Sequence, residues 1–211
     1  MENRALRELV AVLRRAHAGE LAAWLAYRGH AHSLADPVES EEVLAIASQE
    51  MEHRLSVRRM LDDLEARPVR GREALFWGIG SVLGSLCRVS GWFLPMYGAG
   101  LLESGNIREY EEAAGLALAG GRPDLVPDLL RMAQVEWDHE SYFRAKVRSR
   151  PIRVLSLWTL EPLWPAPPPR EAIRPRLPAS FSRGARSRSR RRLEEVPMVP
   201  LSRAAWRGRE R

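Results

Sequence analysis

The sequence predicts an all-α protein built as a bundle of four long helices. Long stretches lack proline and carry apolar residues at helical spacing, and they end at breaks that contain proline or glycine. With 211 residues, 45% of them hydrophobic, the chain can bury one sizeable core but hardly two. Its one cysteine, Cys87, excludes an internal disulfide and cysteine-based zinc or iron–sulfur sites. Any metal must therefore be held by oxygen and nitrogen ligands.

The first two helices are defined by the prolines that separate them. We expect the first helix over residues 6–35, ending before Pro37. Ser40 is followed by two glutamates and is a plausible N-cap for a second helix over residues 40–66, which closes at Pro68.

Residues 75–102 form an apolar run in which Arg88 is the only charged residue. The length would suit a membrane span, but the glycines of the run, Pro95 and Arg88 weaken that interpretation. We expect a helix that is buried or lies on a membrane surface and continues into a third helix over residues 94–119. A fourth helix follows over residues 124–146. Four helices with a long apolar crossover between the second and third have the connectivity of a ferritin-like four-helix bundle.

The composition changes toward the C-terminus. Residues 1–143 carry 22 acidic and 15 basic side chains, whereas residues 144–211 carry 5 acidic and 18 basic ones, with an arginine-serine run at residues 183–192. We therefore expect a helical domain over residues 1–149 and a disordered, proline- and arginine-rich tail over residues 150–211. No aromatic residues interleave with the arginine run, so nucleic-acid binding is disfavoured.

The second and fourth helices contain the same motif, Glu-x-acid-His, at residues 50–53 and 136–139. Residues i and i+3 share a helix face, so each motif can present a carboxylate and an imidazole to one ion. Taken singly, each pair is more simply explained as a contact on the helix surface. The motifs become informative together with the other two helices.

The first and third helices each supply a glutamate followed seven residues later by a tyrosine, on nearly the same face. A glutamate followed by Glu-x-x-His thus occurs twice along the chain, which indicates a pseudo-twofold metal site. The predicted ligands are Glu20, Glu50, His53, Glu103, Glu136 and His139. Because these ligands are mostly hard carboxylates without thiolate, they favour two iron ions over zinc, with manganese as the alternative.

Several residues near the predicted site have weaker claims. Tyr27 and Tyr110 could anchor ligands, although packing with one hydrogen bond is the simpler explanation. His17 either hydrogen-bonds a ligand or packs. His30 and His32 lie near the end of the first helix, where a cation beside the helix dipole explains them.

These motifs resemble those of the demethoxyubiquinone hydroxylases, the di-iron monooxygenases of ubiquinone biosynthesis. The resemblance runs from about residue 14 to about residue 143. Its most specific stretches are His-Ala-Gly-Glu at residues 17–20, Gln-Glu-x-x-His at residues 49–53, and the Arg-Pro pair at residues 67–68. Glutamate, tyrosine and histidine in the third and fourth helices match by type and order.

The resemblance implies O₂-dependent hydroxylation of a polyprenyl benzoquinol ring, with electrons supplied through the quinone substrate or from NADH. Residues 75–102, with their aromatic side chains, could cover a lipid-tailed substrate and lie at a membrane interface, although ordinary burial also explains them. The N-terminus lacks an apolar signal core, so we expect a bacterial cytoplasmic protein, peripheral to the inner face of the cell membrane. Its oligomeric state and any partner in a biosynthetic complex stay open.

Two other functions remain open at this point. One is a ferritin-like or rubrerythrin-like protein that oxidises iron or removes peroxide, which the lack of a cysteine-ligated module and the long apolar run disfavour. The other is a non-catalytic helical module that binds lipid or a partner and whose acidic residues are surface charge.

Overall fold

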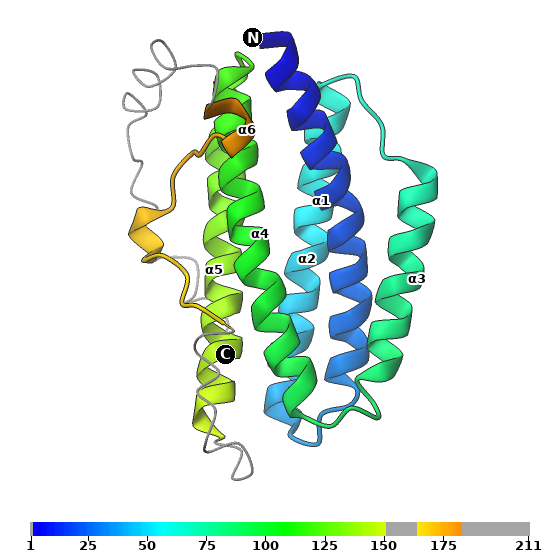
Figure 1. Cartoon of the computed structure of the whole chain (residues 1–211). Coiled ribbons are helices and arrows are strands. Elements are labelled where there is room, and N and C mark those ends of the chain that lie inside the picture. The colour runs from blue at the N-terminus through cyan, green and yellow to red at the C-terminus, as the bar shows by residue number, and fades with distance from the viewer. Residues whose placement is uncertain (1, 151–163, 183–211) are drawn as a thin grey trace, which may run out of the picture.

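The computed structural model describes residues 2–150 and 164–182, and the elements in these ranges are all helical (Figure 1). The long helices, in chain order, are α1 (Glu2–Ala31), α2 (Pro37–Asp63), α3 (Arg70–Leu86), α4 (Phe93–Ala119) and α5 (Val126–Ser149). The short ones are η1 (Pro123–Leu125), η2 (Arg170–Ala172) and α6 (Ala179–Ser182). The prediction of an all-α protein is confirmed.

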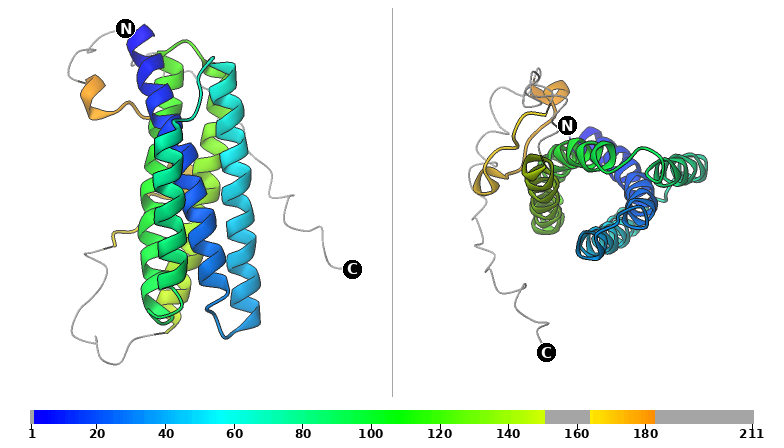
Figure 2. Two further views of the ribbon diagram at one scale, coloured as in Figure 1. Left: turned by 90° about the vertical axis from the view of Figure 1, so that its right-hand side faces the viewer. Right: turned by 90° about the horizontal axis from the view of Figure 1, so that it is seen from below.

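Helices α1, α2, α4 and α5 form the bundle. Helix α1 contacts α2 and α4, and α5 packs against α4. The end-on view in Figure 2 shows these four helices around a common axis, with α3 standing outside them beside α1. The four bundle helices agree with the predicted ones to within a few residues at each end.

The start of α2 differs from the prediction. Asp36, not Ser40, is the N-cap, and its Oδ1 accepts a hydrogen bond of 2.9 Å from the backbone N–H of Val38. Pro37 occupies the first helical turn, where its missing N–H costs no hydrogen bond. Ser40 lies inside the helix, and its hydroxyl donates to the carbonyl oxygen of Ala31 at 2.9 Å, which ties the start of α2 to the end of α1.

Residues 75–102 do not form one continuous apolar crossover. They are divided between α3, a turn and the beginning of α4. Gly91 in the turn has a φ of 74°, a conformation that glycine adopts without steric cost. Within the described residues, none of the helices combines the length and hydropathy that a bilayer span requires.

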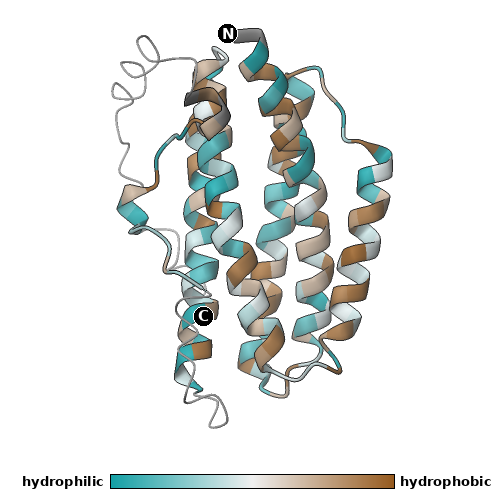
Figure 3. Cartoon of the chain, viewed as in Figure 1, coloured by the Kyte–Doolittle hydropathy of each residue, from teal (hydrophilic) through white to brown (hydrophobic). Residues whose placement is uncertain are grey.

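Helix α3 packs unusually close to α1 through small residues. A Cβ atom placed on Gly29 would lie 2.3 Å from the Cα of Gly84, and one placed on Gly80 would lie 2.6 Å from the Cα of Ala22. The two backbones therefore approach at distances that leave no room for larger side chains. Helix α3 is rich in apolar residues, as the brown bands along it in Figure 3 show, and Leu75, Trp77 and Val82 among them are exposed to solvent.

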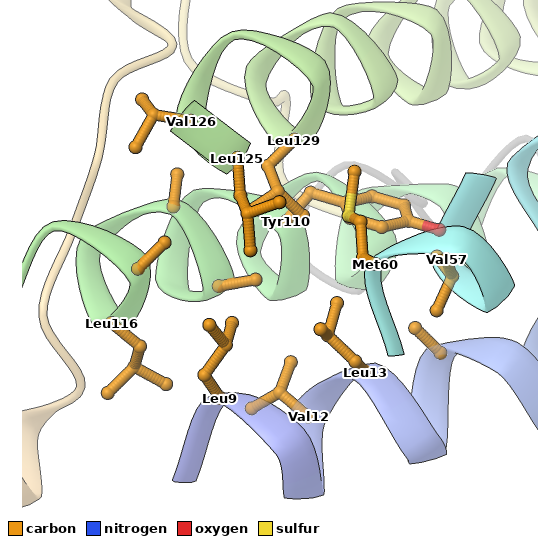
Figure 4. Packing of buried hydrophobic residues seen from close by; sticks show 14 of the residues in the cluster. Leu9, Val12, Leu13, Val57, Met60, Tyr110, Leu116, Leu125, Val126 and Leu129 are labelled. Carbon is orange, nitrogen blue, oxygen red and sulfur yellow. The ribbon is translucent and has the colours of Figure 1, made fainter. Parts of the chain in front are cut away.

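The bundle interior contains two apolar clusters, one toward each end. The first includes Leu9, Leu13, Val57, Leu116 and Leu129, and Figure 4 shows its side chains meeting between α1, α2, α4 and α5. The second cluster is built from different turns of the same helices, and its members include Tyr27, Val43, Met96 and Phe143. On each helix, the turn between the two clusters carries polar residues.

The expectation of a disordered tail over residues 150–211 does not hold for its described part, residues 164–182. Trp164, Ile173 and Phe181 in this part are buried. A Cβ atom on Gly100 of α4 would lie 1.9 Å from the Trp164 ring, so this glycine makes room for the indole. Residues 151–163 and 183–211, which include the arginine-serine run, lie outside the described residues.

Specific hydrogen bonds hold residues 164–182 against α4 and α5. The backbone N–H of Arg176 donates to the carbonyl oxygen of Glu111 at 2.9 Å. The Trp137 indole donates to the carbonyl oxygen of Pro168 at 2.8 Å. Backbone groups and a tryptophan make these contacts. The composition of the segment alone does not indicate that it packs in this way.

The close approach of α1 and α3 predicts the effect of a β-branched side chain at Gly29. We expect Gly29→Val to lower the free energy of unfolding by about 1–3 kcal/mol, because α3 must move away from α1. Chemical denaturation measures the change. Gly78 is the matched control, since no atom lies within 4 Å of a Cβ placed there. Gly78→Ala should be neutral or stabilising by about 0.5–1 kcal/mol, and equal stabilities of Gly29→Val and wild type would contradict the packing.

Candidate metal centre

The six predicted ligands all lie inside the bundle, in the polar layer between the two apolar clusters. Each is buried, and Glu50, Glu103 and Glu136 have no exposed surface. Their positions on the helices are Glu20 on α1, Glu50 and His53 on α2, Glu103 on α4, and Glu136 and His139 on α5. The structure thus brings together, from four helices, all the residues that the sequence motifs selected.

The ligand atoms form two overlapping groups. One group contains Glu20, Glu50, His53 and Glu136, and the other contains Glu50, Glu103, Glu136 and His139. Within each group, one potential ligand atom from every residue lies within 4.8 Å of the others. Because Glu50 and Glu136 belong to both groups, the arrangement suits two adjacent ions better than one.

Contacts between α2 and α5 connect the histidines to these shared carboxylates. The Nδ1 atom of His53 lies 2.9 Å from Oε1 of Glu136, and the Nδ1 atom of His139 lies 3.1 Å from Oε1 of Glu50. On the other side of the ring, Nε2 of His139 is 2.6 Å from Oε1 of Gln49. A carbonyl oxygen only accepts, so Nε2 carries the proton, and in the neutral imidazole Nδ1 keeps a lone pair for a metal.

Each of the two tyrosines donates a hydrogen bond to a glutamate in the other half of the bundle. Tyr27 of α1 donates its hydroxyl proton to Glu103 of α4, and Tyr110 of α4 donates to Glu20 of α1. Burial raises the pKa of both phenols well above the usual value, so they stay protonated and act as donors. The sequence associated each tyrosine with the glutamate on its own helix, whereas the structure pairs it with the glutamate on the opposite helix.

Several buried polar atoms of this site have no hydrogen-bond partner among the described residues. They are Glu20 Oε2, Glu50 Oε1, Glu50 Oε2, Glu136 Oε2 and His139 Nδ1. An unpaired carboxylate oxygen is costly to bury, and four from three glutamates meet here. Lone pairs that converge without donors are what divalent cations require, so the donor set fits bound metal ions.

Electrostatics leads to the same conclusion. Burial raises the pKa of Glu20. Burial also raises the pKa values of Glu50 and Glu103 well above the usual range, and neighbouring carboxylates reinforce this effect. Burial would also raise the pKa of Glu136, but interactions with Glu103 and both histidines hold that pKa well below its usual value. Without cations the site therefore retains protons, and metal binding must release them.

Among the described residues, the hydrogen-bond partner of the His17 ring is Glu73 and not one of the predicted ligands. His17 is buried, and its Nδ1 atom lies 2.8 Å from Oε1 of Glu73 on α3. Arg54 of α2 donates to the other oxygen of Glu73 at 2.6 Å and also to the backbone carbonyl of His17. The trio joins α1, α2 and α3. The sequence analysis missed Arg54 and Glu73, because no local pattern relates residues on three different helices.

The raised pKa values predict how pH affects the metal-free protein. Three glutamates have a folded-state pKa above the unfolded value, so the stability linked to their protonation is present at low pH and is lost as pH rises through the folded-state pKa. Glu136 has the opposite sign, and its contribution is lost only as pH falls through its low folded-state pKa. The lowered pKa values of His17 and His30 act in the opposite direction below about pH 6.5. As pH rises above about 6.5, the Tm of the metal-free protein should therefore fall.

Manganese(II) should reverse this dependence, because it binds the ionised carboxylates and so gains affinity as pH rises. Differential scanning fluorimetry with and without the ion measures both trends. Glu50→Gln, which keeps the shape but cannot ionise, should flatten the pH dependence of the metal-free protein. A Tm of the metal-free wild type that rises with pH above about pH 6.5 would show that the carboxylates are compensated in another way.

The comparisons with known proteins bear on the N-terminal part of the chain. The family model described as "Ubiquinone biosynthesis protein COQ7" matches residues 7–97. None of the curated proteins or solved structures matches the chain. The matched range contains Glu20, Glu50 and His53 and ends before Glu103. The resemblance to the demethoxyubiquinone hydroxylases is therefore confirmed over residues 7–97, where the chain matches the COQ7 family.

Proposed function

We propose that the protein is a ferritin-like di-iron monooxygenase that uses O₂ to hydroxylate a polyprenyl benzoquinol ring in ubiquinone biosynthesis. The observation that carries this proposal is the buried cluster of four glutamates and two histidines, supplied by four helices of a chain that matches the COQ7 family. Two iron ions, when bound, would supply the activation of O₂. The reductant in this proposal is the quinone substrate itself or NADH.

The residues of the chain have distinct tasks in this proposal. Glu50 and Glu136, which belong to both ligand groups, would hold the two ions side by side. Tyr27 and Tyr110 orient Glu103 and Glu20, the glutamates that belong to only one ligand group each. Tyr110 donates to Oε1 of Glu20 and leaves Oε2 without a partner, whereas Oε2 of Glu103 also accepts from the side-chain amide of Asn106 at 3.1 Å. The apolar clusters at both ends limit the access of water to the site.

An apolar pocket reaches the cluster from one side. It has a volume of about 280 Å³ and lies between α1, α3 and α4. Glu20, Tyr27 and Tyr110 line its inner wall, and Phe76 and Ile79 of α3 are among its apolar residues. This geometry supports a substrate with an aromatic ring, since such a ring could lie beside the ligands while apolar side chains surround it.

Helix α3 supports the proposal that the protein associates peripherally with a membrane surface. Large apolar side chains on α3 and the following turn are exposed to solvent: Leu75, Trp77, Ile79, Val82, Leu83, Leu86 and Val89. Helix α3 stands at the periphery of the bundle (Figure 2), and its residues Phe76, Ile79 and Leu83 line the apolar pocket. An exposed apolar helix with a tryptophan suits the boundary between headgroups and acyl chains, where a lipid-tailed quinol would enter.

Metal stoichiometry tests the di-iron site. The anaerobically loaded wild type should hold about two ferrous ions per chain. Glu136→Gln should lose most of the bound iron, because this residue belongs to both ligand groups. The matched control is Glu140→Gln, a change of another fully buried glutamate on α5 that lies outside both groups and pairs with Arg144. The control should keep its iron.

Turnover tests the reaction. With O₂, NADH and a short-chain demethoxyubiquinol analogue, the loaded wild type and Glu140→Gln should add one oxygen atom to the ring, as detected by mass spectrometry, and Glu136→Gln should not. Absence of specific iron from the wild type would reject the di-iron proposal. Specific iron with no ring product would leave an iron or peroxide protein as the better explanation.

Membrane association is tested separately by flotation with anionic phospholipid vesicles. We expect Trp77→Glu and Leu86→Glu each to reduce the bound fraction, because both side chains are more than half exposed on α3. Leu55→Glu is the control, since Leu55 is equally exposed but lies on α2. Equal losses in all three variants would mean that α3 is not the membrane-binding face.

A further inference from the structure

His30 stands apart from the other buried histidines. It is 1% exposed, yet neither of its ring nitrogens has a hydrogen-bond partner in the described part of the chain. The three other buried histidines each make at least one hydrogen bond: His17, His53 and His139. Because buried polar groups are almost always paired, an imidazole with two unpaired nitrogens needs an explanation.

His30 is among the residues that line a second pocket, of about 500 Å³, between α1, α3 and α4. This pocket shares Tyr27, Ala26, Leu83 and Leu102 with the pocket that reaches the metal centre, so the two are neighbours. Among the described residues that line the second pocket, none is an aspartate, glutamate, lysine or arginine. The site would therefore take an uncharged, largely apolar ligand.

The imidazole is neutral in this environment. Burial lowers the pKa of His30 to about 4, so the cation at the helix end that the sequence suggested is not formed near neutral pH. A neutral imidazole offers one N–H donor and one nitrogen acceptor. It can donate to a carbonyl oxygen or accept a proton from a hydroxyl group, and these are the groups of a quinone and a quinol.

We propose that His30 binds a ring oxygen of the quinone or quinol and so orients the ring beside Tyr27 and the metal centre. His30 follows Tyr27 by three residues, about 4.5 Å along the α1 axis. Tyr27 in turn donates to Glu103, so His30, Tyr27 and the ligand cluster lie in succession along one wall. The inference rests on the proposed function, because it names the residue that recognises the polar part of that substrate.

The proposal makes opposite predictions for binding and stability. If His30 had a structural role, its replacement would lower the Tm. An unpaired imidazole instead destabilises the folded protein, so His30→Leu should keep or raise the Tm. The same variant should lose affinity for the ligand, and His30→Gln should restore much of it, because the amide supplies both a donor and an acceptor.

The experiment measures binding to the full-length, metal-free protein by quenching of tryptophan fluorescence, so it does not depend on turnover. The probes are a short-tailed methoxybenzoquinone and a benzene with the same substituents but without the two ring oxygens. For the quinone we expect His30→Leu to raise Kd about tenfold, the effect of one lost hydrogen bond in a buried site. For the deoxy analogue, wild type and variant should bind alike.

Three outcomes would overturn the assignment. Equal quinone affinity of wild type and His30→Leu would show that the imidazole does not touch the ring. A lower Tm of His30→Leu, with no recovery of binding in His30→Gln, would make His30 a structural residue. If the wild type does not bind the quinone at all, the proposed substrate itself fails, and this is distinguished from failure at His30 by the wild-type measurement alone.

Discussion

The structure depends on the burial of four carboxylates and two imidazoles in the middle of the bundle. Charge of this density is tolerated in an apolar interior only when protons or cations neutralise it. This requirement for neutralisation explains why the ligands come from four helices, since no single helix can surround an ion. It also explains why Glu50 and Glu136 lie where both ligand groups meet. The two tyrosines add donors at the remaining carboxylates, so each half of the bundle contacts the other.

The third helix has a different physical basis. Gly29, Gly80 and Gly84 allow α3 to approach α1 at backbone distance, because a larger side chain at these positions would hold the two helices apart. This leaves the apolar side chains of α3 free to line the two pockets and to face solvent. One helix thereby contributes both to the wall beside the polar centre and to the exposed apolar surface.

Residues 164–182 show how a segment without a hydrophobic pattern can still pack. Their contacts with α4 and α5 depend on backbone amides, on ion pairs such as that of Arg176 with Glu111 at 2.8 Å, and on Trp164 over Gly100. Arg144 also places its guanidinium 4.4 Å from the Trp164 ring. Such contacts need the finished surface of the bundle, so composition alone suggested disorder for a segment that the folded helices accommodate.

The sequence by itself determined the helices, the six candidate ligands and the family resemblance, because helical periodicity, breaks at Pro37 and Pro68, and the i, i+3 spacing are local properties of the chain. Only the tertiary structure decided which glutamates accept from Tyr27 and Tyr110, and that His17 pairs with Glu73. It also decided the path of residues 164–182 and left the ring nitrogens of His30 without partners among the described residues. These features join residues far apart in sequence, and their partners are set by how whole helices pack, which no local pattern records.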